Sequence, residues 1–147
     1  MNVELLKLHE NDEYLNECCS LLNEEWPRSE TARMHFLSKS NDKLPISFIL
    51  IDKQSNCVIA HLRVKKDVLS DAAVIESVVV KRERRGKGYG KYIMNKAEQF
   101  IKQIGFTTIK LTTKDKVSFY EKLGYQNISD CKTYVCFGNI TILWKQI

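Results

Sequence analysis

Proline and glycine are scarce in this sequence of 147 residues, which contains two prolines and six glycines. This composition excludes a collagen-like chain and a Pro/Gly-rich disordered one. No apolar run approaches the roughly 18 residues that a membrane span requires. The amino terminus has Asn2 directly after Met1, so it lacks both the basic start of a signal peptide and the glycine needed for myristoylation. We therefore expect a cytoplasmic protein that neither enters a membrane nor is secreted.

Cysteine pairs of the kind that bind metals are also missing. The five cysteines include no C-x-x-C pair, and the three histidines lack a metal-ligand spacing, so no metal site is predicted. Cys18, Cys19 and Cys57 lie in apolar patterns, which indicates buried, reduced thiols. The histidines are expected to be structural.

The chain does have enough residues and enough apolar side chains, 44% of the total, for one folded domain over residues 1–147. Its charge is concentrated. Residues 81–91 hold six basic residues and one acid, a net +5, while the rest of the chain is balanced. Residues 1–25 carry a net −6, so residues 26–147 carry +11. A single basic segment favours a local anion-binding site over a nucleic-acid-binding face.

Hydrophobic periodicity predicts ten elements in the order α-α-β-β-β-α-β-α-β-β. Helices are expected over 11–26, 29–37, 93–104 and 117–123, and strands over 46–51, 57–64, 73–80, 107–113 and 140–144, with a further weak strand after residue 125. Asn11, Ser29 and Asp115 are candidate N-caps, and Gly105 and Gly124 are expected to end helices. Residues 73–113 form a βαβ crossover, so we predict an α/β fold with one mixed sheet and helices on both faces.

A glycine motif, Arg85-Gly86-Lys87-Gly88-Tyr89-Gly90, lies between a buried-type strand and a long helix. Glycines let backbone N–H groups approach a ligand, and a helix N-terminus adds partial positive charge, so the segment is suited to bind phosphate. The spacing is not that of a P-loop, where Ser or Thr would replace Tyr92, nor of the G-x-G-x-x-G dinucleotide motif. It fits R-x-x-G-x-G.

This motif, preceded by Val78-Val79-Val80, resembles the acetyl-CoA-binding motif of the GNAT superfamily of N-acetyltransferases. The segment Phe119-Tyr120-Glu121-Lys122-Leu123-Gly124-Tyr125 resembles the F-Y-x-x-L-G-F/Y segment of the same family. The order of elements agrees over nearly the whole chain. The resemblance implies a single GNAT-like domain that uses acetyl-CoA as co-substrate.

Two further stretches resemble the actin N-terminal acetyltransferases within that superfamily. They are Leu22-Asn23-Glu24-Glu25-Trp26-Pro27-Arg28-Ser29 and Leu111-Thr112-Thr113. This resemblance implies that the acceptor is the acidic amino terminus of a protein, mature actin in particular. The chain has no Pro-rich insertion of the kind that profilin-binding members can have, so direct profilin binding is not expected. Neither a nucleic acid nor a membrane is expected as a partner.

The family resemblance also implies which residues hold the cofactor. The strand at 78–80 would pair with the pantetheine, and the backbone of 85–91 would hold the pyrophosphate, with added charge from basic side chains. A contact from the helix after 115 is implied as well. The cofactor-binding residues predicted in this way are Val78, Val79, Val80, Arg85, Gly86, Lys87, Gly88, Tyr89, Gly90, Lys91 and Ser118.

Acetyl transfer needs an unprotonated amine, a donor for the developing oxyanion and a proton for the leaving thiolate. Strand alternation places Glu76, Val78 and Val80 on one face, unless a bulge of the kind common in this family shifts the register. Glu76 is the candidate base, directly or through water, or else an exposed strand carboxylate or one bound to a nearby lysine. Tyr120 resembles the family's proton donor, or else is a core tyrosine. The Val78 N–H is a candidate oxyanion donor.

Basic side chains outside the glycine motif are candidates for binding an acidic acceptor. Two lie around the turn between the first two helices, two alternate on the second strand, and a threonine lies on the strand at 107–113. The predicted substrate-binding residues are Arg28, Arg33, Arg63, Lys65 and Thr112. Trp26, at helical spacing, is predicted to be mostly in the core.

The leading prediction is an Nα-acetyltransferase for acidic protein termini. One alternative is an acetyltransferase for small-molecule amines, but a cationic acceptor would favour an acidic groove and the surplus here is basic. Another is a non-catalytic acyl-CoA-binding module, against which Tyr120 and the intact glycine motif argue.

Overall fold

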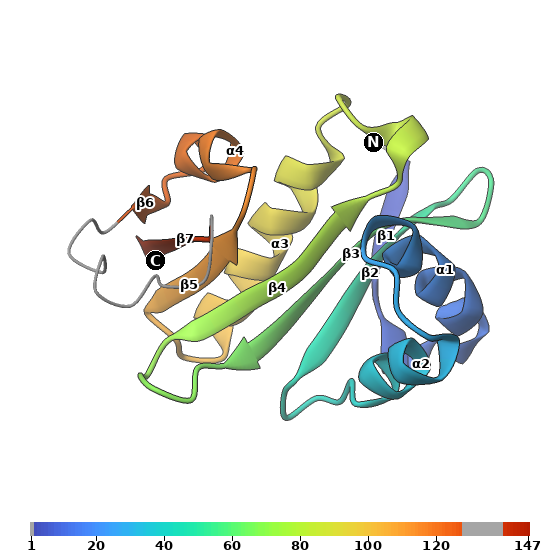
Figure 1. Ribbon diagram of the computed structural model, residues 1–147, viewed down its shortest axis with the longest axis horizontal. Helices are drawn as coiled ribbons and strands as arrows, with labels where there is room; N and C mark the ends of the chain where they lie inside the picture. The colour runs from blue at the N-terminus through green and yellow to red at the C-terminus, as the bar shows by residue number, and fades with distance from the viewer. Residues whose placement is uncertain (1, 128–139) are drawn as a thin grey trace.

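The computed structural model describes residues 2–127 and 140–147. Its strands are β1 (Val3–Lys7), β2 (Ile46–Asp52), β3 (Cys57–Lys66), β4 (Ala73–Val80), β5 (Thr108–Thr113), β6 (Gln126–Asn127) and β7 (Thr141–Gln146). Its α-helices are α1 (Leu15–Glu25), α2 (Glu30–Ser38), α3 (Tyr89–Gln103) and α4 (Val117–Lys122). These strands form one mixed sheet in the order β1-β2-β3-β4-β5-β7-β6 (Figure 1).

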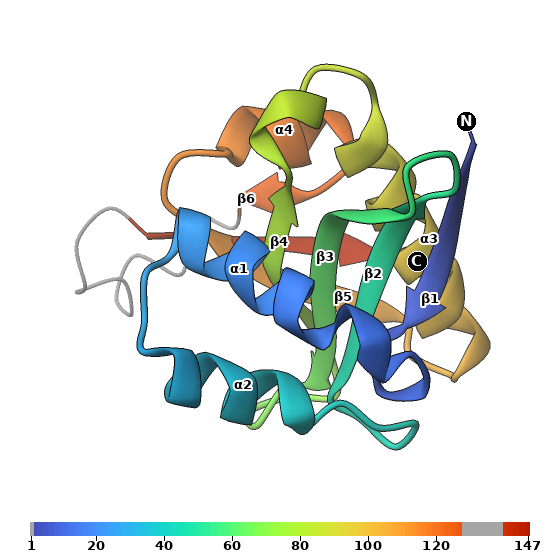
Figure 2. The same cartoon turned by 90° about the vertical axis from the view of Figure 1, so that its right-hand side faces the viewer.

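Helices cover both faces of the sheet, as the sequence predicts. Figure 2 shows α1 and α2 in front of the strands and α3 behind them. Under α3, Ile93, Met94 and Ile101 are fully buried against the sheet, which explains the helical spacing of their apolar side chains. A second core lies under α1 and contains Cys18 and Leu22. Full burial of each such apolar side chain stabilises the folded state by roughly 1.5–3 kcal/mol.

The predicted order of elements is wrong at its start, because a strand, β1, precedes the first helix. This strand has five residues and, in the part of the chain that the structure describes, pairs with β2 alone at the edge of the sheet. Buried and exposed side chains do not alternate along it, so it has little of the period-two pattern by which strands are detected in a sequence.

Two of the three predicted N-caps are also wrong. The Asn11 side chain donates to the Lys7 carbonyl and makes no capping hydrogen bond to the 3-10 turn that follows it, while α1 begins at Leu15. Asp115 makes no capping hydrogen bond to α4. Ser29 is confirmed, since its hydroxyl accepts the Ala32 N–H at 3.1 Å.

The parallel βαβ crossover is confirmed, but its two strands touch over a very short length. β4 pairs with β5 only through Ala73 opposite Ile109 and Val74 opposite Lys110. Beyond Val74 the strands separate, as Figure 1 shows, and β5 continues to pair with β7 on its other side. The separation leaves the β5-facing edge of β4 open where the valine run begins.

A β-bulge in β4 changes the predicted register at the same place. Arg63 of β3 lies opposite Glu76, but His61, two residues earlier, lies opposite Val79, so β4 has one extra residue. The backbone of Ser77, at this extra residue, is left-handed, with φ +53°. After the bulge Val78 packs into the core under α3, whereas Glu76 contacts Arg63 on the opposite side of the sheet. Glu76 therefore does not share a face with Val78 and Val80, and the alternative that a bulge shifts the register is the one that the structure has.

The prediction of buried, reduced thiols is confirmed for two of the three described cysteines, and the third is free but only half-buried. Cys18 and Cys19 are free and buried, while Cys57 is free and half-buried. Cys131 and Cys136 lie outside the described residues. Among the helices of residues 2–127 and 140–147, none has both the length and the apolarity to cross a bilayer.

Candidate active site

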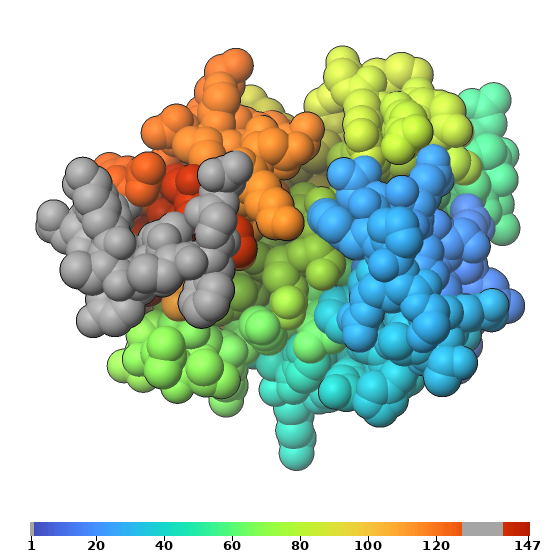
Figure 3. All heavy atoms as spheres, viewed as in Figure 1, coloured from blue at the N-terminus to red at the C-terminus, as the bar shows by residue number. Residues whose placement is uncertain are grey.

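A cleft of about 380 Å³ lies where β4 separates from β5. Figure 3 shows the molecule hollowed between the α1 side and the α4 side, with β4 between them. The cleft brings together the end of β4, the glycine motif, the start of α3 and one side of α4. Its lining residues are Glu25, Val78, Val79, Val80, Arg84, Arg85, Gly86, Gly88, Tyr89, Gly90, Lys91, Lys116, Phe119 and Tyr120.

The glycine motif has the backbone geometry of an anion-binding turn. Gly86 and Gly88 have φ of +78° and +89°, a region that side chains disfavour, and α3 begins directly afterwards at Tyr89. At Gly90 a Cβ atom would lie 3.1 Å from the Phe119 ring, so a side chain would press against the wall of the cleft. The turn and the 15-residue helix together offer N–H groups and partial positive charge to a phosphate.

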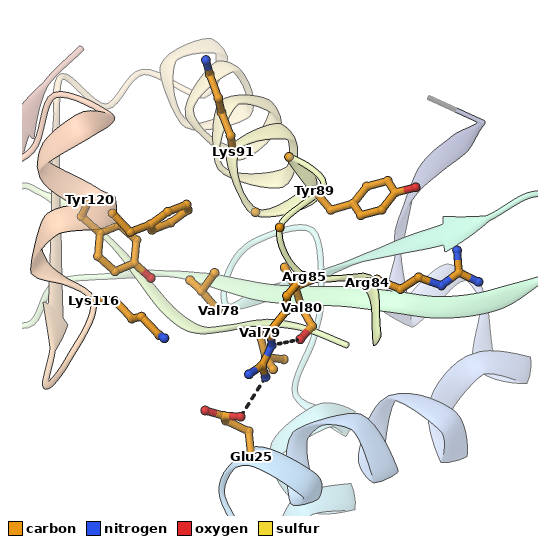
Figure 4. Close-up of a pocket in the computed structure, with 14 residues that line it drawn as sticks. Glu25, Val78, Val79, Val80, Arg84, Arg85, Tyr89, Lys91, Lys116 and Tyr120 are labelled. Carbon is orange, nitrogen blue, oxygen red and sulfur yellow. Dashed lines mark hydrogen bonds and ion pairs between the residues drawn. The ribbon is translucent and has the colours of Figure 1, made fainter. Parts of the chain in front are cut away.

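The basic side chains of the motif lie in different environments. Arg85 donates from Nε to the Val80 carbonyl at 2.8 Å and from Nη2 to Glu25 at 2.9 Å, so its charge is directed to Glu25 (Figure 4). Lys91 is exposed and lines the cleft. Lys87 and Ser118 are exposed but do not line it. The cofactor contacts of these four residues stay predictions.

Tyr120 lies on α4 with its ring in the core and its hydroxyl directed towards Val78 (Figure 4). The ring packs edge-on against Phe119 and Tyr125, at centroid distances of 5.0 and 5.9 Å. Burial raises the pKa of Tyr120 to about 12, and the charge of Asp115 adds to the shift. The phenol therefore stays protonated at neutral pH, as a proton donor must.

A second cleft of about 430 Å³ adjoins the first. Both clefts are lined by Glu25, Val78, Lys116 and Tyr120, so the two spaces meet at these residues. The remaining lining residues of the second cleft are Trp26, Ile75, Glu76, Ser77, Thr112, Thr113, Lys114, Asp115 and Ile140. This arrangement lets two molecules approach Val78 and Tyr120 from different sides.

Glu76 lies in the second cleft between two cations. Its Oε1 atom is 3.4 Å from Arg63 Nε and 3.3 Å from Lys65 Nζ, and its side chain is 27% exposed. Arg63 is held in turn, because its guanidinium lies 4.0 Å from the Phe36 ring centroid and donates to the Phe36 carbonyl. The alternation predicted for Arg63 and Lys65 is confirmed, and both are bound to Glu76.

The prediction that Arg33 binds the acceptor is wrong. Only 3% of this residue is exposed. Its Nε donates to Asn23 Oδ1 at 3.0 Å and its Nη2 donates to the Trp26 carbonyl, so it joins α2 to the end of α1. Arg28 is exposed in the turn between these helices but lines neither cleft.

Several residues that line the clefts were not predicted from the sequence as site residues, among them Glu25, Trp26 and Lys116. Glu25 and Trp26 end α1, and Trp26 is 40% exposed, so its predicted burial in the core is wrong. Lys116 precedes α4 and lines both clefts. The stretch containing Glu25 and Trp26 carried a signal, since it lies in the segment that resembles the actin N-terminal acetyltransferases.

Comparison with known proteins agrees with this geometry. The chain is 37% identical over 121 residues to N-alpha-acetyltransferase 80 of Mus musculus, a match that covers 78% of this chain and 38% of the mouse protein. The chain thus spans well under half the length of that relative.

Solved structures show the same fold. A PaiA N-acetyltransferase of Thermoplasma acidophilum in complex with coenzyme A has a TM-score of 0.79 at 20% identity, over 100% of both chains. An acetyltransferase of the GNAT family from Staphylococcus aureus has a TM-score of 0.77 at 13% identity, over 98% of both chains. The profile of the acetyltransferase (GNAT) family matches residues 12–125. The chain therefore belongs to the GNAT family of acetyltransferases.

Proposed function

We propose that this protein is a cytoplasmic Nα-acetyltransferase that moves the acetyl group of acetyl-CoA to the free amino terminus of an acidic protein, with processed actin as the substrate. The observation that carries the proposal is the meeting of two clefts at Val78 and Tyr120. One cleft has the anion-binding turn, and the other is open to a peptide. The mouse relative named above supports protein amino termini as acceptors.

The first cleft fits acetyl-CoA, which supplies the activated acetyl group. The turn at Gly86 and Gly88 and the N-terminus of α3 would hold the pyrophosphate. The open edge of β4 at residues 78–80 would pair with the amides of the pantetheine, since β5 no longer pairs with it there. Lys91 adds positive charge at the cleft.

The acceptor amine needs only modest help to lose its proton, because a free α-amine has a pKa of roughly 7.7–8.0. Glu76 is the base that we propose, directly or through water. Its Oε1 atom is buried in the second cleft and, within the described residues, makes ionic contacts but no hydrogen bond of good geometry. The side chain is 27% exposed, so the other carboxylate oxygen, Oε2, is the one that we propose accepts a hydrogen bond from water or an ammonium group.

Two further groups serve the transfer itself. The Val78 N–H would stabilise negative charge on the acetyl oxygen, and Tyr120 would give its proton to the departing sulfur. Their positions support these roles, because both residues line both clefts. The buried phenol, with its raised pKa, is fully protonated before transfer.

Charge around the second cleft supports an acidic acceptor. Two of its three carboxylates are paired, Glu25 with Arg85 and Glu76 with Arg63 and Lys65. Of the remaining charged residues that line this cleft, two are lysines, Lys114 and Lys116, and one is a carboxylate, Asp115. The cleft surroundings are therefore net positive, which suits a peptide that begins with Asp or Glu. Arg28, exposed in the adjoining turn, and Thr112 are proposed as further contacts.

A peptide-acetylation assay with the purified chain tests the proposal. Peptides that begin Asp-Asp or Glu-Glu should be acetylated at least tenfold better, by kcat/KM, than peptides that begin Ser-Ala or Met-Lys. Purified actin with a processed terminus should be modified without added profilin. Preferred turnover of polyamines would indicate a small-molecule acetyltransferase instead. Binding of acetyl-CoA without transfer to any amine would indicate a non-catalytic module.

A further inference from the structure

At the bulge in β4 one residue, Ser77, has an unusual backbone conformation, and its carbonyl accepts a hydrogen bond from a side chain. Ser77 has φ +53°, a left-handed conformation that residues other than glycine adopt at a cost in energy. The Ser77 carbonyl accepts a hydrogen bond from His61 Nδ1 at 2.8 Å. His61 is fully buried on β3 and lines neither cleft.

The hydrogen bonds of His61 determine where its ring proton lies. A carbonyl oxygen can only accept, so Nδ1 carries the proton. Burial lowers the pKa of His61 to about 4, so the ring is neutral and Nε2 accepts from the Ser47 hydroxyl, 3.0 Å away. Ser47 is fixed as well, because it is buried and its N–H donates to the Ser40 hydroxyl at 2.9 Å. The imidazole ring is therefore held from both sides.

The geometry of the peptide group connects this ring to the active site. The Ser77 carbonyl and the Val78 N–H belong to one peptide unit, which is planar and trans, so they point in opposite directions. A carbonyl held towards β3 by His61 therefore directs the Val78 N–H away from β3. Val78 lines both clefts, which lie on that other side of β4.

We infer that His61 is a positioning residue, which orients the Val78 N–H towards the acetyl oxygen by holding the Ser77 carbonyl. The inference rests on the proposed function, because it takes the Val78 N–H as the oxyanion donor. Ser47 completes the arrangement by fixing the imidazole tautomer. His61 itself touches neither substrate.

Two substitutions separate the two hydrogen bonds of the ring. In His61→Asn the amide nitrogen lies near the position of Nδ1 and can still donate to Ser77. In His61→Gln the amide reaches the position of Nε2, so the contact with Ser47 is kept and the Ser77 carbonyl loses its donor. Each variant loses one buried hydrogen bond, so similar falls in Tm are expected, and the pair controls for stability.

Steady-state kinetics with the preferred peptide test the inference. Loss of an oxyanion donor costs about 10²–10³ in kcat, and a misdirected donor should cost at least about tenfold. We expect this loss in His61→Gln, with KM and the Kd for acetyl-CoA within about twofold of the unchanged protein. His61→Asn should stay within about threefold in kcat. Equal kcat values for the two variants, or losses that only follow Tm, would overturn the inference.

A second measurement needs no turnover. The ¹H–¹⁵N resonance of Val78 should shift in His61→Gln and stay near its original position in His61→Asn; an unmoved resonance in both overturns the inference. Absence of peptide acetylation by the unchanged protein would refute the proposed function and leave this measurement intact. If His61→Gln does not fold, the pair is compared in a Ser77→Gly background, where the left-handed conformation carries no strain. There too the glutamine variant must fall at least about tenfold below the asparagine variant in kcat, and equality overturns the inference.

Discussion

Replacing Tyr120 by phenylalanine removes one oxygen atom from the meeting point of the two clefts. Within the described residues the Tyr120 hydroxyl makes no hydrogen bond, and the ring contacts with Phe119 and Tyr125 do not involve it. The free energy of unfolding should therefore change by less than about 1 kcal/mol, because no hydrogen bond is lost. Any large effect on kcat then reports on chemistry.

The expected kinetic effect follows from the role of the hydroxyl. General-acid catalysis contributes roughly 10²–10⁴-fold, so kcat should fall about 100-fold or more, equivalent to about 2.7 kcal/mol of activation free energy. KM should change little, since the proton is needed only during transfer. With a pKa of about 12 for Tyr120, only about one phenol in a thousand is ionised at pH 9. The kcat of the unchanged protein should therefore show no decline from Tyr120 ionisation up to that pH.

Tyr125→Phe is the matched control, because Tyr125 lies in the same aromatic cluster but its hydroxyl donates to Glu98 at 2.8 Å and lines neither cleft. This variant should lose stability, by roughly 1.5–3 kcal/mol for a hydrogen bond to a charged group, and keep its kcat. Stopped assays of peptide acetylation, with thermal unfolding of each variant, decide the question. A kcat for Tyr120→Phe within about twofold of the unchanged protein would refute the role of proton donor and make Tyr120 a core residue.

Three further perturbations test other parts of the site. Gly88→Asp puts a carboxylate beside the N-terminus of α3, so calorimetry should show the Kd for acetyl-CoA rising at least about tenfold; an unchanged Kd removes the pyrophosphate site from this turn. Lys116→Glu should lower kcat/KM about tenfold or more for acidic peptides but little for neutral ones. The control Lys122→Glu, on α4 but outside both clefts, should change kcat/KM for neither class of peptide. Equal effects of Lys116→Glu on both classes would contradict the electrostatic account. Burial lowers the pKa of His61 from its usual 6.5 to about 4, so the unfolded chain binds the proton first and stability is lost as pH falls from about 6.5 to 4, by about 3 kcal/mol in total. Urea unfolding of the unchanged protein and His61→Asn at pH 7 and 4.5 measures this loss, and an identical pH dependence in both would show that His61 is not its source.

Elements with local signals were predictable from the sequence. The spacing of Ile93, Met94 and Ile101 predicts the buried side of α3, and Gly105 and Gly124 follow helices with φ of +102° and +97°. The glycine motif is predictable for the same reason, because phosphate binding depends on consecutive backbone groups of one turn.

Features that depend on partners distant in the sequence were not predictable. The family resemblance allows for a bulge in β4, but its place at Ser77 depends on β4 having one residue more than β3 between two fixed pairs. The sequence of β4 alone does not reveal how many residues β3 has there. Arg33 looks like any surface arginine until the turn after α1 presents Asn23 and the Trp26 carbonyl to it. Both features concern the acceptor side, which is assembled from four separate elements, while the glycine motif is one continuous segment.

The two residue pairs that join β4 to β5 have a mechanical consequence. Within residues 2–127 and 140–147 they are the only strand pairing between β1–β4 and β5–β7, so the sheet consists of two plates that meet at one corner. Ile75 from one plate and Leu143 from the other are buried in the core that α3 covers. Met94 lies in the same core behind the sheet, so side chains there support both plates and the opening between them. A change of side-chain volume there should therefore alter the width of the opening without a direct contact with either proposed substrate.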